Sequence, residues 1–276
     1  MDPGCYFLGD IGCLNDNLEK LVKIIGSKIR LGEKIFLLGD NFYNHGVRTI
    51  NDPMWELYQN IFEPIKYQNI YGVLGNHDYE GNPHVQLSSS YMKNNDFYYK
   101  YRFSLKTEFF VIDTVQLHEN HCGIDEGDMI RIHNKKYKEL QEKQLDWLKR
   151  SLSESRAHNK VVLGHYPLMS NGVYCNSLAS LAHKLMPIFD RYNVTTYICG
   201  HEHNIQYMEQ NSPCYSFKQF IVGCSSQYRN DEFYVQQNRS MFDNTDNYYL
   251  KMNESGNRLI FDYVNKDGKM KYCYII

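Results

Sequence analysis

The sequence lacks the features that mark several large classes of protein. Its 276 residues contain no apolar run of the ~18 residues that a membrane-spanning helix needs. Lysine and arginine (30) do not outnumber aspartate and glutamate (32), so no basic field draws the chain to nucleic acid. The first residues show no basic segment followed by a long apolar one, so no export signal is predicted. We therefore expect a protein that folds in water, with no membrane span and no nucleic acid as partner.

Cysteine spacing excludes two further kinds of site. The eight cysteines include no Cys-x-x-Cys pair, which argues against a zinc ribbon and against a thioredoxin-type motif. Several of them lie inside apolar runs, where cysteine is usually a small buried hydrophobic side chain. We predict reduced thiols, and a bridge involving Cys122 in a polar segment is the alternative.

Apolar and aromatic residues are abundant, at 42% and 14% of the chain, and they can fill a substantial core. The length suits one large domain, so we predict a single domain over residues 1–276. Five short apolar runs have strand composition, and each ends in a glycine followed by a possible metal ligand. These runs read CYFLGD, IFLLGD, IYGVLGNHD, VVLGH and TYICGH.

Helical patterns lie between the runs. They cover residues 17–30, a stretch from about 52, residues 137–155 and residues 178–192. Alternating strands and helices predict an α/β fold with functional groups at the carboxyl ends of the strands. Two regions, 97–117 and the C-terminal third, have the pattern of antiparallel strands. Together they predict an αββα sandwich: two mixed β-sheets packed face to face and flanked by helices.

The strand ends carry oxygen and imidazole groups of the kind that bind metal ions. One glycine–aspartate pair after a strand is often only a turn, but five such endings in one chain are improbable by chance. A carboxylate can bridge two ions, so seven side chains can fill two four-ligand sites. If His201 and His203 lie on an extended segment, their imidazoles point apart, one toward each ion. The seven candidate ligands are Asp10, Asp40, Tyr43, Asn76, His165, His201 and His203.

The ordered motifs GDIG, GDNFY, GNHDY, GHYP and GHEHN resemble the purple acid phosphatases, most closely the small tartrate-resistant type, within the calcineurin-like metallophosphoesterase superfamily. The resemblance runs from about Tyr6 to Tyr207, includes DTVQL (113–117) as a strand, and is looser beyond. Other members of the superfamily usually begin with Asp-x-His. Here Gly12 stands in the place of that histidine, and on the family pattern Tyr43 supplies the missing ligand.

The resemblance implies a single metallophosphoesterase domain that hydrolyses phosphomonoesters by in-line attack of a metal-bound hydroxide. It divides the ligands into a first site of Asp10, Asp40, Tyr43 and His203 and a second of Asp40, Asn76, His165 and His201, with Asp40 shared. Two carboxylates and a phenolate are hard, negatively charged donors that favour Fe(III). The neutral amide and imidazoles of the second site suit divalent Fe, Zn or Mn.

Further residues follow from the same resemblance. His77 matches a histidine that contacts phosphate or protonates the leaving group, and orienting a ligand is its alternative role. Asn41, Asn204 and Asp78 are expected to hold ligands by hydrogen bonds. Tyr174 falls at or near the place of a second active-site histidine, where it either donates a hydrogen bond or covers the pocket. The polar segment 117–136 matches a family loop that restrains activity until it is cut, and we hypothesise partial autoinhibition.

Two other functions stay open at this point. One is a catalytically idle scaffold or binding protein on the same fold, although all seven ligand types are retained. The other is a phosphodiesterase or nucleotide hydrolase. We expect a small-molecule or protein phosphomonoester as substrate and a monomer as the working unit. The missing signal favours the cytoplasm, whereas the family is usually secreted or lysosomal, so the compartment is left undecided.

Overall fold

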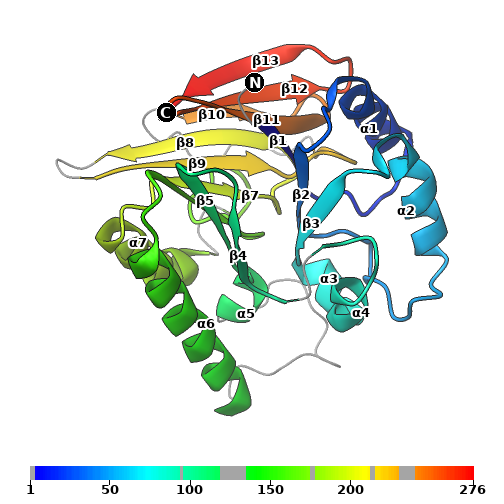
Figure 1. Ribbon diagram of the computed structural model, residues 1–276. Helices are drawn as coiled ribbons and strands as arrows, with labels where there is room; N and C mark the ends of the chain where they lie inside the picture. Colours follow the sequence, from blue (N-terminus) through cyan, green and yellow to red (C-terminus); the bar gives the residue numbers. More distant parts are fainter. Residues whose placement is uncertain (1–3, 94–95, 119–134, 175–177, 212–214, 230–239) are drawn as a thin grey trace.

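Two mixed β-sheets packed face to face form the middle of the molecule, and helices cover their outer faces (Figure 1). The computed structural model describes residues 4–93, 96–118, 135–174, 178–211, 215–229 and 240–276. The strand order is β13-β12-β11-β1-β2-β3 in the first sheet and β10-β8-β9-β7-β6-β5-β4 in the second. The predicted α/β sandwich is therefore confirmed.

The first sheet combines three parallel strands from the N-terminal half with an antiparallel C-terminal meander. Its strands are β1 (Gly4–Leu8), β2 (Lys34–Leu38), β3 (Asn69–Val73), β11 (Tyr248–Ser255), β12 (Arg258–Asn265) and β13 (Met270–Ile275). The second sheet has a parallel centre, β5-β6-β7-β9, between antiparallel edges. Its strands are β4 (Tyr99–Arg102), β5 (Thr107–Val111), β6 (Asn159–Leu163), β7 (Thr196–Cys199), β8 (Ile205–Asn211), β9 (Ser216–Val222) and β10 (Ser240–Asp243).

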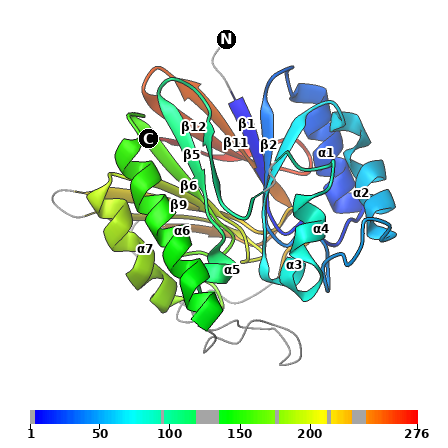
Figure 2. The same cartoon turned by 60° about the horizontal axis from the view of Figure 1, so that its bottom comes forward.

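The helices form the two outer layers, as both views of the molecule show (Figures 1 and 2). The helical segments are α1 (Asp16–Lys28), α2 (Met54–Phe62), η1 (Glu63–Ile65), α3 (Asn76–Glu80), α4 (Pro83–Leu87), α5 (Thr114–Leu117), α6 (Lys135–Glu154) and α7 (Ala179–Arg191). Helices α1 and α2 lie on the first sheet, and α6 and α7 lie on the second. The four long helices lie within two residues of the ranges that the sequence predicts.

Successive side chains along each strand point to opposite faces of its sheet, and this alternation produces three apolar layers. Phe7 and Phe36 of the first sheet point between the sheets, where the Phe36 ring meets Phe109 of the second sheet at a centroid distance of 5.1 Å. Their neighbours Tyr6 and Ile35 point outward, against the helices. Because both faces of the central strands are covered, these strands carry continuous apolar runs. Among the described residues no helix is both long and apolar enough to cross a membrane.

One predicted strand is wrong. Residues 113–117 (DTVQL) were expected to be extended, but Thr114–Leu117 is the short helix α5. The Asp113 carboxylate caps it by accepting a hydrogen bond from Gln116 N at 3.0 Å. Gln144 of α6 binds both the amide and the carbonyl of Asp113, which turns the chain away from the sheet.

The cysteines that the structure describes are free thiols, as predicted: Cys5, Cys13, Cys199, Cys224 and Cys273. The alternative of a bridge at Cys122 lies outside the described residues, as does most of the segment 117–136 to which we assign autoinhibition.

Candidate metal centre

The candidate ligands meet where five parallel strands end. Strands β1, β2 and β3 of the first sheet deliver Asp10, Asp40 and Asn76, and β6 and β7 of the second deliver His165 and His201. Parallel strands place their carboxyl ends on one edge, so the two packed sheets bring these groups to a common place. The centre therefore lies at the seam between the sheets.

Three of these residues adopt the left-handed backbone conformation: Asp10 with φ 56°, Asp40 with φ 53° and His201 with φ 71°. Side chains other than glycine seldom occupy this region, and such residues cluster at functional sites. Neighbouring glycines let the strand ends approach. A methyl group at Gly75 would lie 2.1 Å from Asp40 Oδ1, and one at Gly200 would lie 2.5 Å from Asp10 Oδ2.

A first cluster forms around the phenol of Tyr43. Its hydroxyl donates to Asp10 Oδ1 at 2.9 Å and lies 2.9 Å from His203 Nε2. Asp40 Oδ2 lies 3.4 Å away. Burial, followed by the charges of the two carboxylates, raises the pKa of Tyr43 well above its usual value. A phenolate can form here only when a strongly positive ion compensates these charges, which fits a hard trivalent metal.

Gly12, which replaces the usual histidine, explains how the phenol fits. A methyl group at Gly12 would lie 2.5 Å from Tyr43 N and 2.9 Å from Tyr43 Cγ. Tyr43 N also donates to the Gly12 carbonyl at 3.1 Å. The tyrosine therefore occupies the space that a side chain at position 12 would need.

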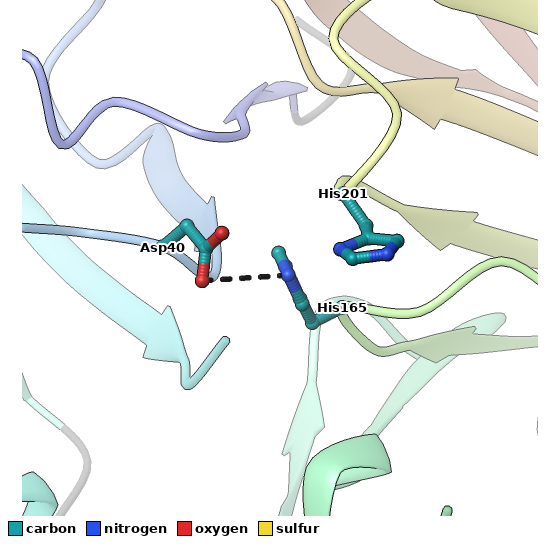
Figure 3. A group of neighbouring side chains, drawn as sticks. All are labelled: Asp40, His165 and His201. Carbon is teal, nitrogen blue, oxygen red and sulfur yellow. Dashed lines mark ion pairs between the residues drawn. The ribbon is translucent and has the colours of Figure 1, made fainter. Parts of the chain in front are cut away.

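A second cluster consists of Asp40, His165 and His201, whose possible ligand atoms all lie within 4.8 Å of one another (Figure 3). His165 Nδ1 donates to the Leu38 carbonyl at 2.8 Å, so His165 Nε2 presents a lone pair. That lone pair lies 3.1 Å from the amide oxygen of Asn76 and 3.5 Å from Asp40 Oδ1. His201 Nε2 is buried and makes no hydrogen bond within the described part of the chain. The acceptor atoms of Asn76, Asp40 and His165 thus face one another, and His201 Nε2 beside them has no hydrogen-bond partner among the residues that the structure describes. A cation bound among these atoms would satisfy them.

Burial shifts the pKa values of the acidic and basic groups in the second cluster. Burial and then the charge of Asp10 raise the pKa of Asp40 to about 7. Burial lowers the pKa of His165 and lowers that of His201 further. A bound ion would favour the carboxylate and the neutral imidazoles, since it binds both as ligands.

One geometric expectation for the two histidines is wrong. The segment 201–204 bends instead of running extended, and the left-handed backbone of His201 re-aims its ring. The imidazoles still face different clusters. His203 contacts Tyr43, and the His201 ring lies 5.1 Å from that of His165 between centroids. All seven predicted ligands are thus brought together.

Residues 5–204 match the family model of the calcineurin-like phosphoesterases. The chain belongs to this family. Among curated relatives, the rabbit (Oryctolagus cuniculus) tartrate-resistant acid phosphatase type 5 is 33% identical over 209 residues, 71% of this chain and 61% of that protein. Purple acid phosphatase 17 of Arabidopsis thaliana is 32% identical over 223 residues, 75% and 64% of the two chains. This calcineurin-like phosphoesterase therefore spans about three fifths of the length of these relatives.

Two solved structures share its fold. GAP50, the anchor in the inner membrane complex of Plasmodium, superposes with a TM-score of 0.81 at 24% identity and covers 99% of this chain and 88% of its own. Purple acid phosphatase PPD1 from yellow lupin seeds superposes with a TM-score of 0.73 at 14% identity, over 100% and 53% of the chains. The predicted resemblance to purple acid phosphatases is confirmed, and the phosphoesterase family implies a dimetal centre.

His77 and Asn41, two of the other predicted site residues, have different surroundings in this phosphoesterase. His77 lies at the rim of the centre, with Nε2 4.0 Å from Asp40 Oδ2 and its ring edge-on to Tyr43 at 4.9 Å. Asn41 is fully buried, and its amide nitrogen donates to the Val73 carbonyl and to Asp78. These contacts stabilise the turn formed by residues 39–41.

Tyr174 lies against the second cluster. Its ring centroid is 4.3 Å from that of His201, with the planes tilted by 37°. It also lines a cavity of about 630 Å³ beside α7, whose wall includes Leu178, Met186 and Tyr215. Tyr174 therefore contacts His201 and is also part of the lining of this cavity.

Sequence reasoning missed Glu202, which lies between two candidate ligands in GHEH. This buried carboxylate accepts hydrogen bonds from Ser170 Oγ and from Tyr174 N. A methyl group at Gly172 would lie 2.6 Å from its Oε2. Glu202 thus ties the segment that carries Tyr174 to the histidine motif, and the acidic residue inside GHEH was the available signal.

Proposed function

We propose that this chain is a binuclear metal-dependent acid phosphatase that hydrolyses phosphomonoesters. The observation that carries the proposal is the convergence of all seven candidate ligands at the seam of the two sheets, with Tyr43 in the space that Gly12 leaves free. Relatives named acid phosphatases, at about a third identity over most of the chain, support the reaction class.

The chain offers two groups of ligands that differ in charge. Trivalent iron suits the first group, because two carboxylates and a phenolate are hard anionic donors. A divalent ion, Fe, Zn or Mn, suits the second, because its other donors are a neutral amide and imidazoles. The groups are Asp10, Asp40, Tyr43 and His203 for the first ion and Asp40, Asn76, His165 and His201 for the second. When bound, the ions activate water and stabilise charge on the phosphoryl oxygens.

Other residues of the chain orient the ester and handle its proton. His77 Nε2 lies at the rim of the centre, 4.0 Å from Asp40 Oδ2, where it would face a phosphoryl group bound to the ions. There it donates a hydrogen bond to phosphate or a proton to the departing oxygen. Asn41 acts through Asp78 and the backbone near Asp40, so it positions ligands. The substrate is a small-molecule or protein phosphomonoester, and the protein works as a monomer without nucleic acid.

The deciding experiment measures hydrolysis of p-nitrophenyl phosphate and its bis-ester after metal reconstitution, from acid to neutral pH. Asp40→Asn removes the shared carboxylate, and we expect turnover to fall at least about 100-fold, with loss of bound metal. Asp146→Asn, on the exposed face of α6, is the matched control and should retain activity. Equal activity of the two variants would refute the proposal, and faster turnover of the bis-ester would favour a phosphodiesterase.

A non-catalytic scaffold is the competing function. The likeness to GAP50 shows the shared fold alone, because the identity is 24%. A folded wild type that binds two metal ions and turns over neither ester would favour the scaffold.

A further inference from the structure

The carboxylate of Glu80 lies between two histidines at the rim of the candidate centre. Its Oε1 is 3.2 Å from His77 Nδ1, and its Oε2 is 2.5 Å from His45 Nδ1. Glu80 is mostly buried, with 15% of its side chain exposed, whereas His45 is 72% exposed. One carboxylate therefore links a surface imidazole to the imidazole that faces the metal ligands.

The contacts of His77 define which ring nitrogen carries the proton. Nδ1 lies 2.6 Å from the Asn44 carbonyl oxygen as well as beside Glu80. Both neighbours can only accept, so Nδ1 must donate. The other nitrogen, Nε2, is the one turned toward Asp40. A neutral His77 therefore carries its proton on Nδ1 and turns Nε2 toward the centre.

Hydrogen bonds and close packing hold the backbone that carries His77 and Glu80. His77 and Glu80 are three residues apart on α3, which places them on the same side of the helix. The His77 backbone N–H donates to Asp40 Oδ1 at 3.0 Å. The facing turn packs directly on α3, since a methyl group at Gly46 would lie 2.9 Å from the His77 carbonyl oxygen. The ring is therefore fixed by its backbone, and the Nδ1 contacts fix its rotation.

We propose that Glu80 is a positioning residue that, together with the Asn44 carbonyl, fixes the tautomer and orientation of His77, so that Nε2 faces the phosphoryl group of the substrate. His45 holds the second carboxylate oxygen and keeps Glu80 in place. The part that concerns the substrate rests on the proposed phosphatase function. The part that concerns the tautomer rests on the contacts of His77 alone.

A double-mutant cycle on the metal-loaded protein tests the link between the two residues. Glu80→Leu should lower kcat for p-nitrophenyl phosphate by about 10- to 100-fold, as loss of an orienting partner does, while bound metal stays constant. Glu80→Gln, which keeps one acceptor oxygen, should recover part of this loss. In a His77→Ala background, Glu80→Leu should change kcat by less than about twofold, because the residue it orients is absent.

The matched control is Glu63→Leu, which removes a carboxylate that pairs with Lys66 on the surface and should leave kcat unchanged. Equal losses from Glu80→Leu with and without His77 would overturn the proposal, since they would show that Glu80 acts on something else.

A second readout does not depend on activity. Long-range ¹H–¹⁵N spectra of the imidazoles in the metal-free protein at alkaline pH should show His77 as the Nδ1–H tautomer, and Glu80→Leu should shift its Nδ1 resonance although the Asn44 carbonyl still accepts from that nitrogen. An Nε2–H tautomer in the wild type would refute the role of Glu80. If the wild type has no phosphatase activity, the proposed function fails, and these spectra still decide whether Glu80 orients His77.

Discussion

Gly12→Ala tests whether Tyr43 depends on the empty space at position 12. The new methyl group would lie 2.5 Å from Tyr43 N, 2.8 Å from Phe42 C and 2.9 Å from Tyr43 Cγ. Two of these are backbone atoms and the third is the root of the ring, so none can swing away. Ordinary carbon contacts are ~3.5–4 Å, so the Tyr43 segment must move by about 0.5–1 Å. Such overpacking costs typically ~1–3 kcal/mol.

That displacement should act on the phenol more than on the fold. The Tyr43 hydroxyl contacts Asp10 and His203 at 2.9 Å, and a shift of this size breaks at least one contact. We expect urea unfolding of the metal-free variant to show a loss of ~1–2 kcal/mol, because a stiffer unfolded chain offsets part of the overpacking. The iron-reconstituted variant should lose most of the visible tyrosinate-to-iron(III) charge-transfer absorption.

Gly72→Ala is the matched control. Its methyl group would meet only the Met92 side chain, whose sulfur is the nearest atom at 2.6 Å and can rotate aside. That variant should keep both iron and absorption. A Gly12→Ala protein with wild-type stability and undiminished absorption would refute the account of how Tyr43 fits beside residue 12.

Three further outcomes follow from the centre and its surroundings. His201→Ala should lower bound metal from two ions to one per chain, by elemental analysis, because it removes a donor from the second cluster only. Tyr174→Phe should keep kcat within about twofold, since the ring that packs on His201 is retained, whereas Tyr174→Ala should weaken the second ion about tenfold in a chelator titration. Burial raises the pKa of Asp113 to about 7, above its unfolded value, so its contribution to stability is full at acid pH and is lost as pH rises toward about 7. In the metal-free Asp113→Asn variant, the fall in the free energy of unfolding between acid and neutral pH should be smaller than in the wild type by roughly 2–4 kcal/mol. Equal dependence of this free energy on pH in the two proteins would contradict the prediction.

The places of the candidate ligands in the fold were predictable from the sequence because most of them directly follow strands that the sequence marks clearly. An apolar run that stops at Gly-Asp or Gly-His gives both the strand and its carboxyl end. Strand direction then places Asp10, Asp40 and His165 on one edge without knowledge of any contact. The two-sheet architecture followed from the alternation of strands and helices together with two regions that have the pattern of antiparallel strands.

The missed features depend on partners that are distant in sequence. The DTVQL segment contains β-branched residues that favour a strand, but Gln144 of α6 takes the backbone of Asp113 and a helix begins there. Glu80 sits in a stretch that reads as a turn, and its meaning comes from His45, 35 residues earlier. His201 has a left-handed backbone, and its N–H donates to Asp10 Oδ2, a partner 191 residues away that no local pattern encodes.

The division of the ligands between the sheets links chemistry to assembly of the chain. Neither sheet supplies a complete set of donors: the first supplies both carboxylates, and the second supplies all three imidazoles. A complete set of the proposed ligands therefore needs both sheets in place, and an ion present at a thousand times its dissociation constant would add about 4 kcal/mol to the packed state. The proposed ions would then hold the two sheets together as well as supply the chemistry of the centre.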